Sequence, residues 1–305
     1  MVRRPYVVVV GGANMDIAGR PNGPLVPHDS NLGTVRLSHG GVGRNIAHNL
    51  ALLGVDTRLV TAFGDDPQAA DLLRGCREAN IDVTESIEVP GGATSTYLFV
   101  MDDRGDMEVA INDMAILDQL TPQRMAERLD LINGAAACVI ETNLPAETLA
   151  WLTSHVEVPI FCDPISTAKA HRLDGLLGGI EALKPNRLEA SELTGVDIHD
   201  EESLALACDR LLDLGVSKAF ISLGADGLLC ADRTQTVRLA LIPCNVINTT
   251  GAGDAMMAAL VWSFLQGLTL EESGLAGLAA SSIAVESVQT VNPLLSEAFL
   301  RERMR

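Results

Sequence analysis

The segment that could do the most specific chemistry runs from Asn248 to Ala255 and reads N-T-T-G-A-G-D-A. A Gly-Ala-Gly turn that opens a helix leaves several backbone N–H groups unpaired, and the helix dipole adds positive potential there. The amides of Gly251, Ala252 and Gly253 are therefore expected to bind an anion such as a phosphoryl group in transfer. Asp254, in the first turn, could accept the proton of a substrate hydroxyl. A simple acidic cap on the helix would explain the same residues equally well.

A second glycine cluster, at Gly40, Gly41 and Gly43, leads into an amphipathic helical pattern that contains Asn45. Glycines let a ligand approach the backbone, and an amide side chain offers both a donor and an acceptor to vicinal hydroxyls. These residues favour a sugar over a phosphate, although tight packing of a helix on a strand would also require glycines. Neither a G-x-G-x-x-G fingerprint nor a P-loop is present, so a nucleotide would need another architecture.

Asn14 and Asp16 follow the apolar run at 7–10. Ligands of open α/β sheets bind just past the carboxyl ends of the strands, so this pair could bind substrate hydroxyls. A turn that needs Asn and Asp is the alternative.

Two later segments could serve a nucleotide and its metal. Asn186 and Glu189 lie three apart at a helix start and could hold a hydrated magnesium ion, although an ordinary cap with an acidic third residue is the simpler explanation. The S-L-G-A-D-G string after another strand, with Ser222, Gly224 and Gly227, allows close approach of nucleotide phosphates or forms a plain β-turn.

The elements that must position these residues alternate between short apolar runs and longer stretches of helical period, which indicates an α/β fold with a mostly parallel sheet flanked by helices. The predicted strands are 7–10, 57–63, 136–141, 159–163, 182–184 and 219–223. The predicted helices are 43–53, 68–79, 122–132, 146–155, 187–194, 201–214, 252–266 and 270–288.

Two segments, 16–39 and 86–113, break this alternation. Period-two patterns at 94–100, and a turn expected at 103–105, predict a small β-sheet. A sheet of this size buries little by itself, so we expect it to cover an opening of the main sheet as a lid.

Composition limits the classes of partner. The chain has 305 residues, which we treat as one domain, with 22 basic and 40 acidic side chains and a formal charge of −18. Such a charge repels nucleic acid and anionic membranes. The sequence has no apolar run long enough to cross a bilayer and no signal-peptide pattern, which predicts a cytoplasmic protein. The six cysteines show no C-x-x-C spacing, so no structural metal is expected.

Taken in order, Gly40-Gly41 with Asn45, N-x-x-E at 186–189, S-L-G-A-D-G at 222–227 and T-G-A-G-D at 250–254 resemble the motifs of the ribokinase-like (PfkB) carbohydrate and nucleoside kinases. The resemblance extends from Val7 to about Val288. It implies a Rossmann-like α/β domain with a β-lid, ATP as donor, Mg²⁺, and transfer of the γ-phosphoryl group to a primary alcohol.

The resemblance also implies roles for residues. Asp254 would be the base, the amides of Gly251, Ala252 and Gly253 the anion hole, and Asn186 and Glu189 would organise magnesium through water. The acceptor would be held by Asn14, Asp16, Gly40, Gly41, Asn45, Thr96, Asn112 and Asp254. The nucleotide would be held by Asn186, Ser222, Gly224, Gly227, Thr250 and Gly253. Closure of the lid would exclude water, so Ser95, Thr96 and Tyr97 should affect the rate.

Longer strings at 40–47, 110–114, 183–190 and 246–257 resemble one subgroup, the bacterial pseudouridine kinases, which implies pseudouridine as the small-molecule acceptor, phosphorylated on its 5′-hydroxyl. Asn112 is then either a contact to the nucleoside or a turn residue. Aromatic residues make up only 3% of the chain, which disfavours a purine pocket of stacked rings. A kinase for uridine, adenosine or ribose, and a non-catalytic regulator that binds a nucleotide or sugar, are the alternatives.

Two further expectations concern a cation and a second chain. Many relatives have Asp in a monovalent-cation loop where this chain has Asn248, and a neutral side chain weakens such a site, so potassium dependence stays open. An exposed edge of the lid suggests a homodimer, although edge strands are as often covered or charged.

Overall fold

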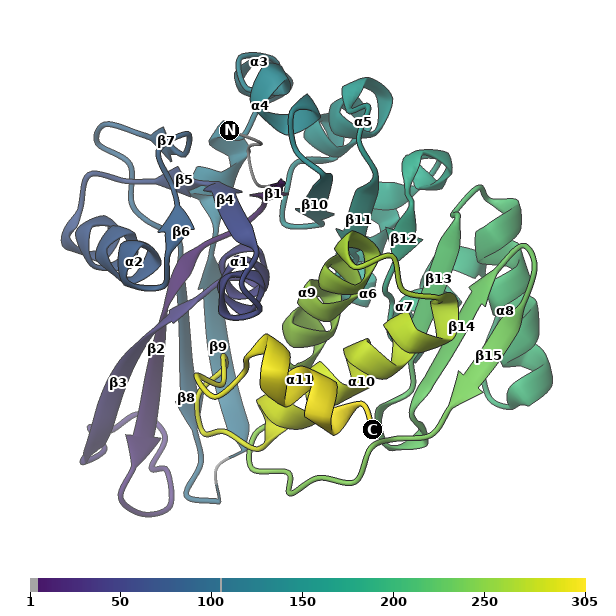
Figure 1. Ribbon diagram of the computed structural model, residues 1–305. Coiled ribbons are helices and arrows are strands. Elements are labelled where there is room, and N and C mark those ends of the chain that lie inside the picture. Colours follow the sequence, from purple (N-terminus) through teal and green to yellow (C-terminus); the bar gives the residue numbers. More distant parts are fainter. Residues whose placement is uncertain (1–4, 105) are drawn as a thin grey trace.

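The protein is described by a computed structural model over residues 5–104 and 106–305, and its centre is a nine-stranded sheet (Figure 1). The strands are, in spatial order, β15 (Thr236–Leu239), β14 (Leu228–Asp232), β13 (Lys218–Ser222), β12 (Ala182–Leu183), β11 (Ile160–Asp163), β10 (Ala137–Glu141), β1 (Tyr6–Val10), β4 (Asp56–Val60) and β6 (Ile81–Asp82). Neighbours are parallel from β6 to β13, and β14 and β15 add an antiparallel edge.

Helices cover both faces of this sheet, because its strands are apolar on both sides. In β1, Val8 and Val10 belong to one buried cluster and Val7 and Val9 to the other. The first face is covered by α3 (Pro122–Ala126), α4 (Leu129–Asn133), α5 (Ala146–His155), α7 (Arg187–Thr194) and α8 (Glu201–Asp213). The second face is covered by α1 (Val42–Leu52), α2 (Pro67–Glu78), α9 (Ala252–Leu265) and α10 (Leu270–Val285). The single turn α6 (Thr167–Ala170) follows β11, and α11 (Glu297–Arg303) packs on α9 and α10.

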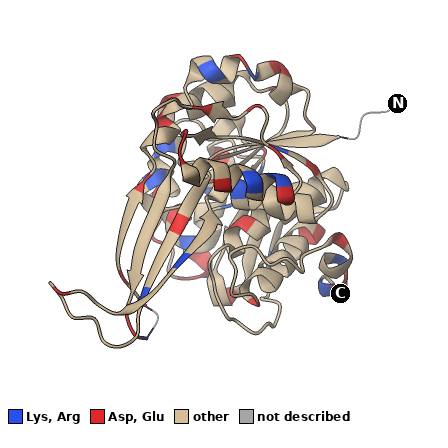
Figure 2. Ribbon diagram, turned by 90° about the vertical axis from the view of Figure 1, so that its left-hand side faces the viewer, with Lys and Arg blue, Asp and Glu red and all other residues tan. Residues whose placement is uncertain are grey.

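A separate four-stranded sheet, called here the small sheet, extends away from the α/β body (Figure 1). Its order is β3 (Gly33–Gly40), β2 (Asn14–Pro21), β8 (Thr96–Met101) and β9 (Met107–Asp113). Figure 2 views this side of the molecule, with α2 in front carrying basic and acidic residues and the long strands of the small sheet mostly uncharged.

The predicted fold class is confirmed, and the differences have local causes. The predicted helix 122–132 divides into α3 and α4 because Arg128 has non-helical torsions (φ −112°, ψ 6°). The predicted strand 57–63 also divides, since β5 (Ala62–Phe63) leaves the main sheet and pairs with β7 (Ile87–Glu88). Segment 86–95 therefore does not join the small sheet. Of the turn predicted at 103–105, Gly105 lies outside the described residues. No helix within the described ranges is long and apolar enough to cross a membrane.

Candidate active site

The candidate site lies where the carboxyl ends of the parallel strands meet the amino-terminal ends of α1 and α9, two helices that pack side by side (Figure 1). Parallel strands end at the same edge of the sheet, so residues far apart in sequence converge there. Glu141 and Asp163 end β10 and β11, and Lys184 directly follows β12.

The turn before α9 requires glycine at Gly251. Its φ is +85°, and a Cβ there would lie 2.1 Å from the carbonyl oxygen of Thr290. Ala252 and Gly253 then form the first helical positions, where amides have no carbonyl of the preceding turn to pair with. The N–H of Ala252 reaches the carbonyl of Thr249 only at 3.4 Å. The helix start therefore presents the positive end of a 14-residue dipole, an arrangement that favours an anion.

Asp254, at the third position of α9, is buried and accepts a hydrogen bond from Asn45: the Nδ2 to Oδ2 distance is 2.9 Å. This contact joins the two glycine-rich motifs, which are 209 residues apart. Burial raises the pKa of Asp254 to about 7, with a further increase from the charge of Asp163, while Asn45 and Lys184 act in the opposite direction. A carboxyl with a pKa near neutrality is well matched to exchange a proton with substrate.

Sequence reasoning missed Lys184, a cation that lies beside this helix start. Its side chain is 5% exposed, and Nζ lies 3.1 Å from Oδ2 of Asp163. A Cβ built on Gly253 would lie 3.1 Å from the same Nζ, so the ammonium lies directly beside the predicted anion hole. Burial lowers the pKa of Lys184, but the charges of Asp163, Glu189 and Asp254 outweigh it and raise that pKa above its usual value.

Glu141 was missed as well. Its carboxylate is fully buried and accepts hydrogen bonds from the backbone N–H groups of Gly12 and Asn143. Burial nevertheless raises its pKa, and the charge of Lys169, whose Nζ donates to Oδ1 of Asn143, opposes the increase. The signal available in the sequence was positional: Glu141, Asp163 and Lys184 each stand at or just past the end of a predicted parallel strand.

The glycines around the start of α1 serve close packing. Gly41 has φ +95°, and a Cβ on it would lie 2.5 Å from the carbonyl oxygen of Gly12. A Cβ on Gly43 would lie 2.8 Å from the Cα of Gly11. The packing explanation therefore holds for these two positions, and it brings Asn45 to Asp254. At Gly40 the constraint is different, because a Cβ would lie 2.4 Å from the Asp16 carboxylate.

Asn14 and Asp16 form a polar pair at the base of the small sheet, with Asn14 Nδ2 donating to Asp16 Oδ1 at 2.6 Å. Burial is the largest influence on Asp16 and raises its pKa. The register places Asp16 beside Tyr97, and Tyr97 beside Asn112, so these three side chains share one face of the small sheet.

Thr96 pairs with Met15, a core residue, and therefore lies on the opposite face from Asp16. The structure thus brings Asn14, Asp16 and Gly40 together and places Asn112 on their face, but it does not bring Thr96 there.

Asn186 and Glu189 form a reciprocal capping box at the start of α7. Oδ1 of Asn186 accepts from the Glu189 N–H at 2.9 Å, and Oε2 of Glu189 accepts from the Asn186 N–H at 2.8 Å. This is the simpler of the two explanations that the sequence left open. Burial raises the pKa of Glu189, which lies within the field of Asp163 and Lys184. The excess of carboxylates over ammonium groups here fits a hydrated divalent cation, which takes few direct protein ligands.

The remaining predicted nucleotide residues line a neighbouring stretch of the same edge. The N–H of Ser222 donates to the Pro185 carbonyl at 2.9 Å, which holds the loop after β13 against the Asn186 segment. Gly224 and Gly227 have φ values of +60° and +87° within a tight turn. Thr250 is exposed beside the α9 start.

Asn248, in the predicted cation loop, is partly exposed, and its Oδ1 accepts the N–H of Thr250 at 3.0 Å. The amide oxygen of Asn248 thus accepts a hydrogen bond from within the loop.

Comparisons with known proteins identify the family. The chain matches the model of the pfkB family of carbohydrate kinases over residues 4–297. It is 39% identical over 300 residues to the pseudouridine kinase of Escherichia coli K12, covering 98% of this chain and 96% of that one. An uncharacterized sugar kinase of the same organism is 37% identical over 298 residues, covering 97% and 82%. A solved structure of Arabidopsis thaliana ribokinase, complexed with ribose and ATP, has the same fold, with a TM-score of 0.88, 23% identity and 99% coverage of both chains. The chain is therefore a kinase of the PfkB family.

Proposed function

We propose that this kinase phosphorylates the 5′-hydroxyl of pseudouridine with ATP. The observation that carries the proposal is the contact of Asn45 with Asp254 beneath the open amides of α9, because it joins a hydroxyl-binding side chain, a carboxylate base and an anion site. The 39% identity to a pseudouridine kinase supports the choice of acceptor.

In the proposed reaction, the acceptor oxygen attacks the γ-phosphorus of ATP in line with the bond to the β-phosphate. The new bond is O5′–P, the broken bond is the β–γ bridge, ADP leaves, and the hydroxyl proton passes to Asp254 Oδ1 or Oδ2. Charge on the transferring group is stabilised by the amides of Gly251, Ala252 and Gly253 and by the ammonium of Lys184. Such catalysis depends on positioning and electrostatics more than on covalent chemistry.

ATP is expected, since ribokinase-like kinases bind ATP, and we propose magnesium as the cation that accompanies it. We propose that Ser222, Gly224, Gly227 and Thr250 border the nucleotide, and that Asn186 and Glu189 hold the waters of the cation. Magnesium, when bound, would neutralise charge on the phosphates. The loop at Asn248 contains no carboxylate of its own, which weakens a potassium site, so turnover measured with and without potassium tests whether the cation contributes.

The acceptor is proposed to lie between the small sheet and the start of α1. Asn14, Asp16 and Asn45 would bind ribose hydroxyls, while Asn112 and Tyr97, further along the same face, would reach the base. Pseudouridine has one more ring N–H than uridine, and a pocket that accepts a hydrogen bond from it rejects the analogue strongly, because its own acceptor is left unpaired. The small sheet would close as a lid over this space and exclude water.

The first test is ADP formation from ATP and Mg²⁺ with pseudouridine, uridine, adenosine and ribose supplied separately. We expect kcat/KM for pseudouridine to exceed that for uridine by at least about 10²-fold. Preference for another member of the panel would contradict the assigned acceptor and leave the kinase chemistry in place. No turnover with any of them would favour a non-catalytic regulator.

We also propose that the chain dimerises through the small sheet. The face opposite Asp16 exposes a set of large apolar side chains, unusual on a free surface, with exposed fractions of 67% for Val35, 62% for Leu37, 53% for Val109 and 63% for Ile111. Register places them on one face across β3 and β9, with Ile17 and Leu98 between Leu37 and Ile111.

The dimer is tested by light scattering on Leu37→Asp, which is expected to convert a dimeric wild type to a monomer. Leu206→Asp serves as the matched control, because Leu206 is 51% exposed on α8, outside the small sheet, and should leave the mass unchanged. A monomeric wild type would contradict the proposal.

A further inference from the structure

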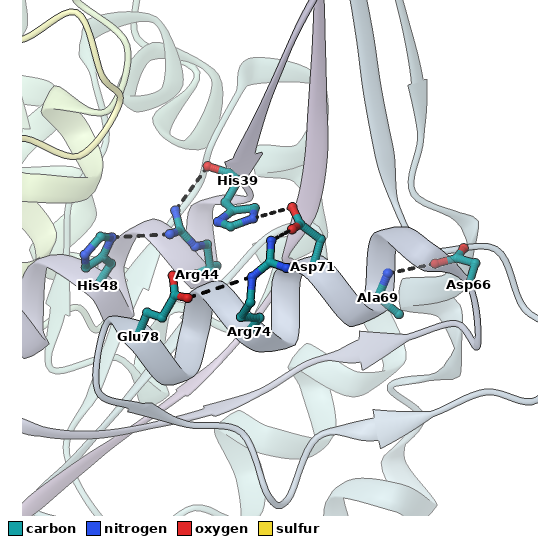
Figure 3. Close-up of polar contacts among 8 residues, drawn as sticks. All are labelled: His39, Arg44, His48, Asp66, Ala69, Asp71, Arg74 and Glu78. Atoms are coloured by element: carbon teal, nitrogen blue, oxygen red, sulfur yellow. Dashed lines mark hydrogen bonds and ion pairs between the residues drawn. The ribbon is translucent and has the colours of Figure 1, made fainter.

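A buried arginine, Arg44, contacts the His39 carbonyl at the base of the small sheet (Figure 3), and it also contacts Asn45. Its side chain is 6% exposed, yet it forms no ion pair with any carboxylate among the described residues. Nη1 donates to the His39 carbonyl at 3.1 Å and to Asn45 Oδ1 at 3.2 Å, and Nη2 lies 3.3 Å from His48 Nδ1. Nε has no partner. A buried charge that no carboxylate contacts directly is costly, and Cys76 and the charge of Asp16 offset its burial only in part, so its presence here calls for an explanation beyond packing.

The contact with Asn45 determines which way the Asn45 amide faces. A guanidinium has only donors, so it must meet the amide oxygen, and the amide nitrogen is then left to donate to Asp254. A flipped amide would instead turn its oxygen toward the Asp254 carboxylate. The observed orientation stabilises the ionised form of Asp254, whereas the flipped one would stabilise the protonated form.

We propose that Arg44 is a positioning residue for phosphoryl transfer: it fixes the Asn45 amide with its N–H toward Asp254 and so keeps the base ionised and aimed. This inference rests on the proposed function of Asp254 as the base. Arg44 does not touch the reacting atoms in this scheme and acts only through Asn45.

The charged and titratable groups around Arg44, Asn45 and Asp254 agree with that assignment. His48 must accept from Arg44 and is therefore neutral; burial, with the charges of Arg44 and His39, lowers its pKa to about 4. The groups facing Arg44 are Asp16 on β2, His39 on β3, His48 on α1 and Cys76 on α2. The groups facing Asp254 are Asp163, Lys184 and Glu141, besides the amide of Asn45. Asp16, which is proposed to bind the acceptor, is the carboxylate whose charge acts on Arg44. The charge of Arg44 in turn opposes the rise in the pKa of Asp16.

Arg44 also connects Asn45 to the base of the small sheet. It binds the carbonyl of His39 near the end of β3, and the His39 ring contacts Asp71 of α2, with Nε2 2.8 Å from Oδ2 (Figure 3). Asp71 in turn contacts Arg74, whose Nε lies 3.8 Å from Oε1 of Glu78. A movement of β3 would therefore pull on the same guanidinium that orients Asn45.

The test compares Arg44→Met with Arg74→Met. Both remove one arginine charge from the network of Figure 3, but Arg74 is 62% exposed in its side chain and contacts neither Asn45 nor Asp254. In Arg44→Met we expect the acidic limb of the pH profile of kcat/KM for pseudouridine to move up by about one pH unit, because the ionised Asp254 loses a hydrogen bond. In Arg74→Met the limb should stay in place.

A readout that needs no substrate is the ¹³C carboxyl resonance of Asp254, assigned by its loss in Asp254→Asn. Its titration midpoint should rise in Arg44→Met and not in Arg74→Met. If Arg44→Met fails to fold, Arg44→Lys can replace it. This variant exchanges the two-nitrogen fork for one ammonium, so the titration midpoint of Asp254 should rise by a smaller amount. Unchanged midpoints in a folded Arg44 variant would overturn this inference alone, whereas full turnover in Asp254→Asn would overturn the proposed base.

Discussion

Asp254→Asn is expected to lower kcat by at least about 10²-fold while leaving the affinity for pseudouridine nearly unchanged. The amide keeps the shape of the side chain and still accepts from Asn45, but it cannot take the hydroxyl proton. The measurement is steady-state ADP formation together with calorimetric titration of the nucleoside. Turnover within about tenfold of the wild type would show that another group is the base.

The same variant should be more stable than the wild type. Burial raises the pKa of Asp254 to about 7 in the folded protein, above the value of 3.8 for an exposed Asp. The folded chain therefore loses stability as the pH rises between these values, and it stays less stable at higher pH because the buried group is then ionised. A neutral amide avoids this loss, so thermal unfolding above neutrality should show a higher Tm. An inactive variant with a raised Tm cannot be explained by misfolding.

Lys184→Met is the second change with a large expected effect. It removes the ammonium beside Gly253, so we expect kcat to fall by about 10²-fold through loss of charge stabilisation at the transferring phosphoryl group. It also leaves the buried carboxylate of Asp163 unpaired, which should cost about 3–5 kcal/mol of folding free energy. Kinetics across a pH series separates this loss from any rise in the pKa of Asp254.

A double variant separates catalysis from stability. Adding Asp163→Asn to Lys184→Met removes the unpaired charge, so the Tm should recover while kcat stays low. If kcat recovers with the Tm, Lys184 is only the structural partner of Asp163. Arg301→Met is a suitable control, because Arg301 is a partly exposed cation on α11 that contacts Glu297, Gln266 and the Trp262 ring but none of the proposed site residues.

Much of the architecture could be predicted from the sequence because it depends on local patterns. Apolar runs such as Val7–Val10 are buried on both faces, and glycine-led turns do open α1 and α9. The small sheet was also predicted, from its period-two pattern. Two features were harder to predict from the sequence. β14 and β15 form a hairpin at the sheet edge, and the departure of β5 from β4 depends on a tertiary pairing with β7.

The site was only partly predictable for the same reason. Motifs located Asp254, Asn45 and the glycines, since those stand in contiguous strings. Lys184 and Glu141 gain their importance from burial and from charges on other strands, and no local pattern records which strands lie adjacent. The orientation of Asn45 likewise depends on Arg44, whose neighbours come from β2, β3 and α2.

The distance in sequence between Asn45 and Asp254 affects how the enzyme is made. Nearly all that we assign to the acceptor lies within the first 113 residues, and the base and anion hole lie after residue 250. A chain emerging from the ribosome can fold the small sheet and the first strands while α9 is still unmade. Such a chain has neither the base nor the anion hole, so it cannot transfer phosphate or waste ATP by hydrolysis. Catalysis can therefore begin only after α9, which carries the base and the anion hole, has been made.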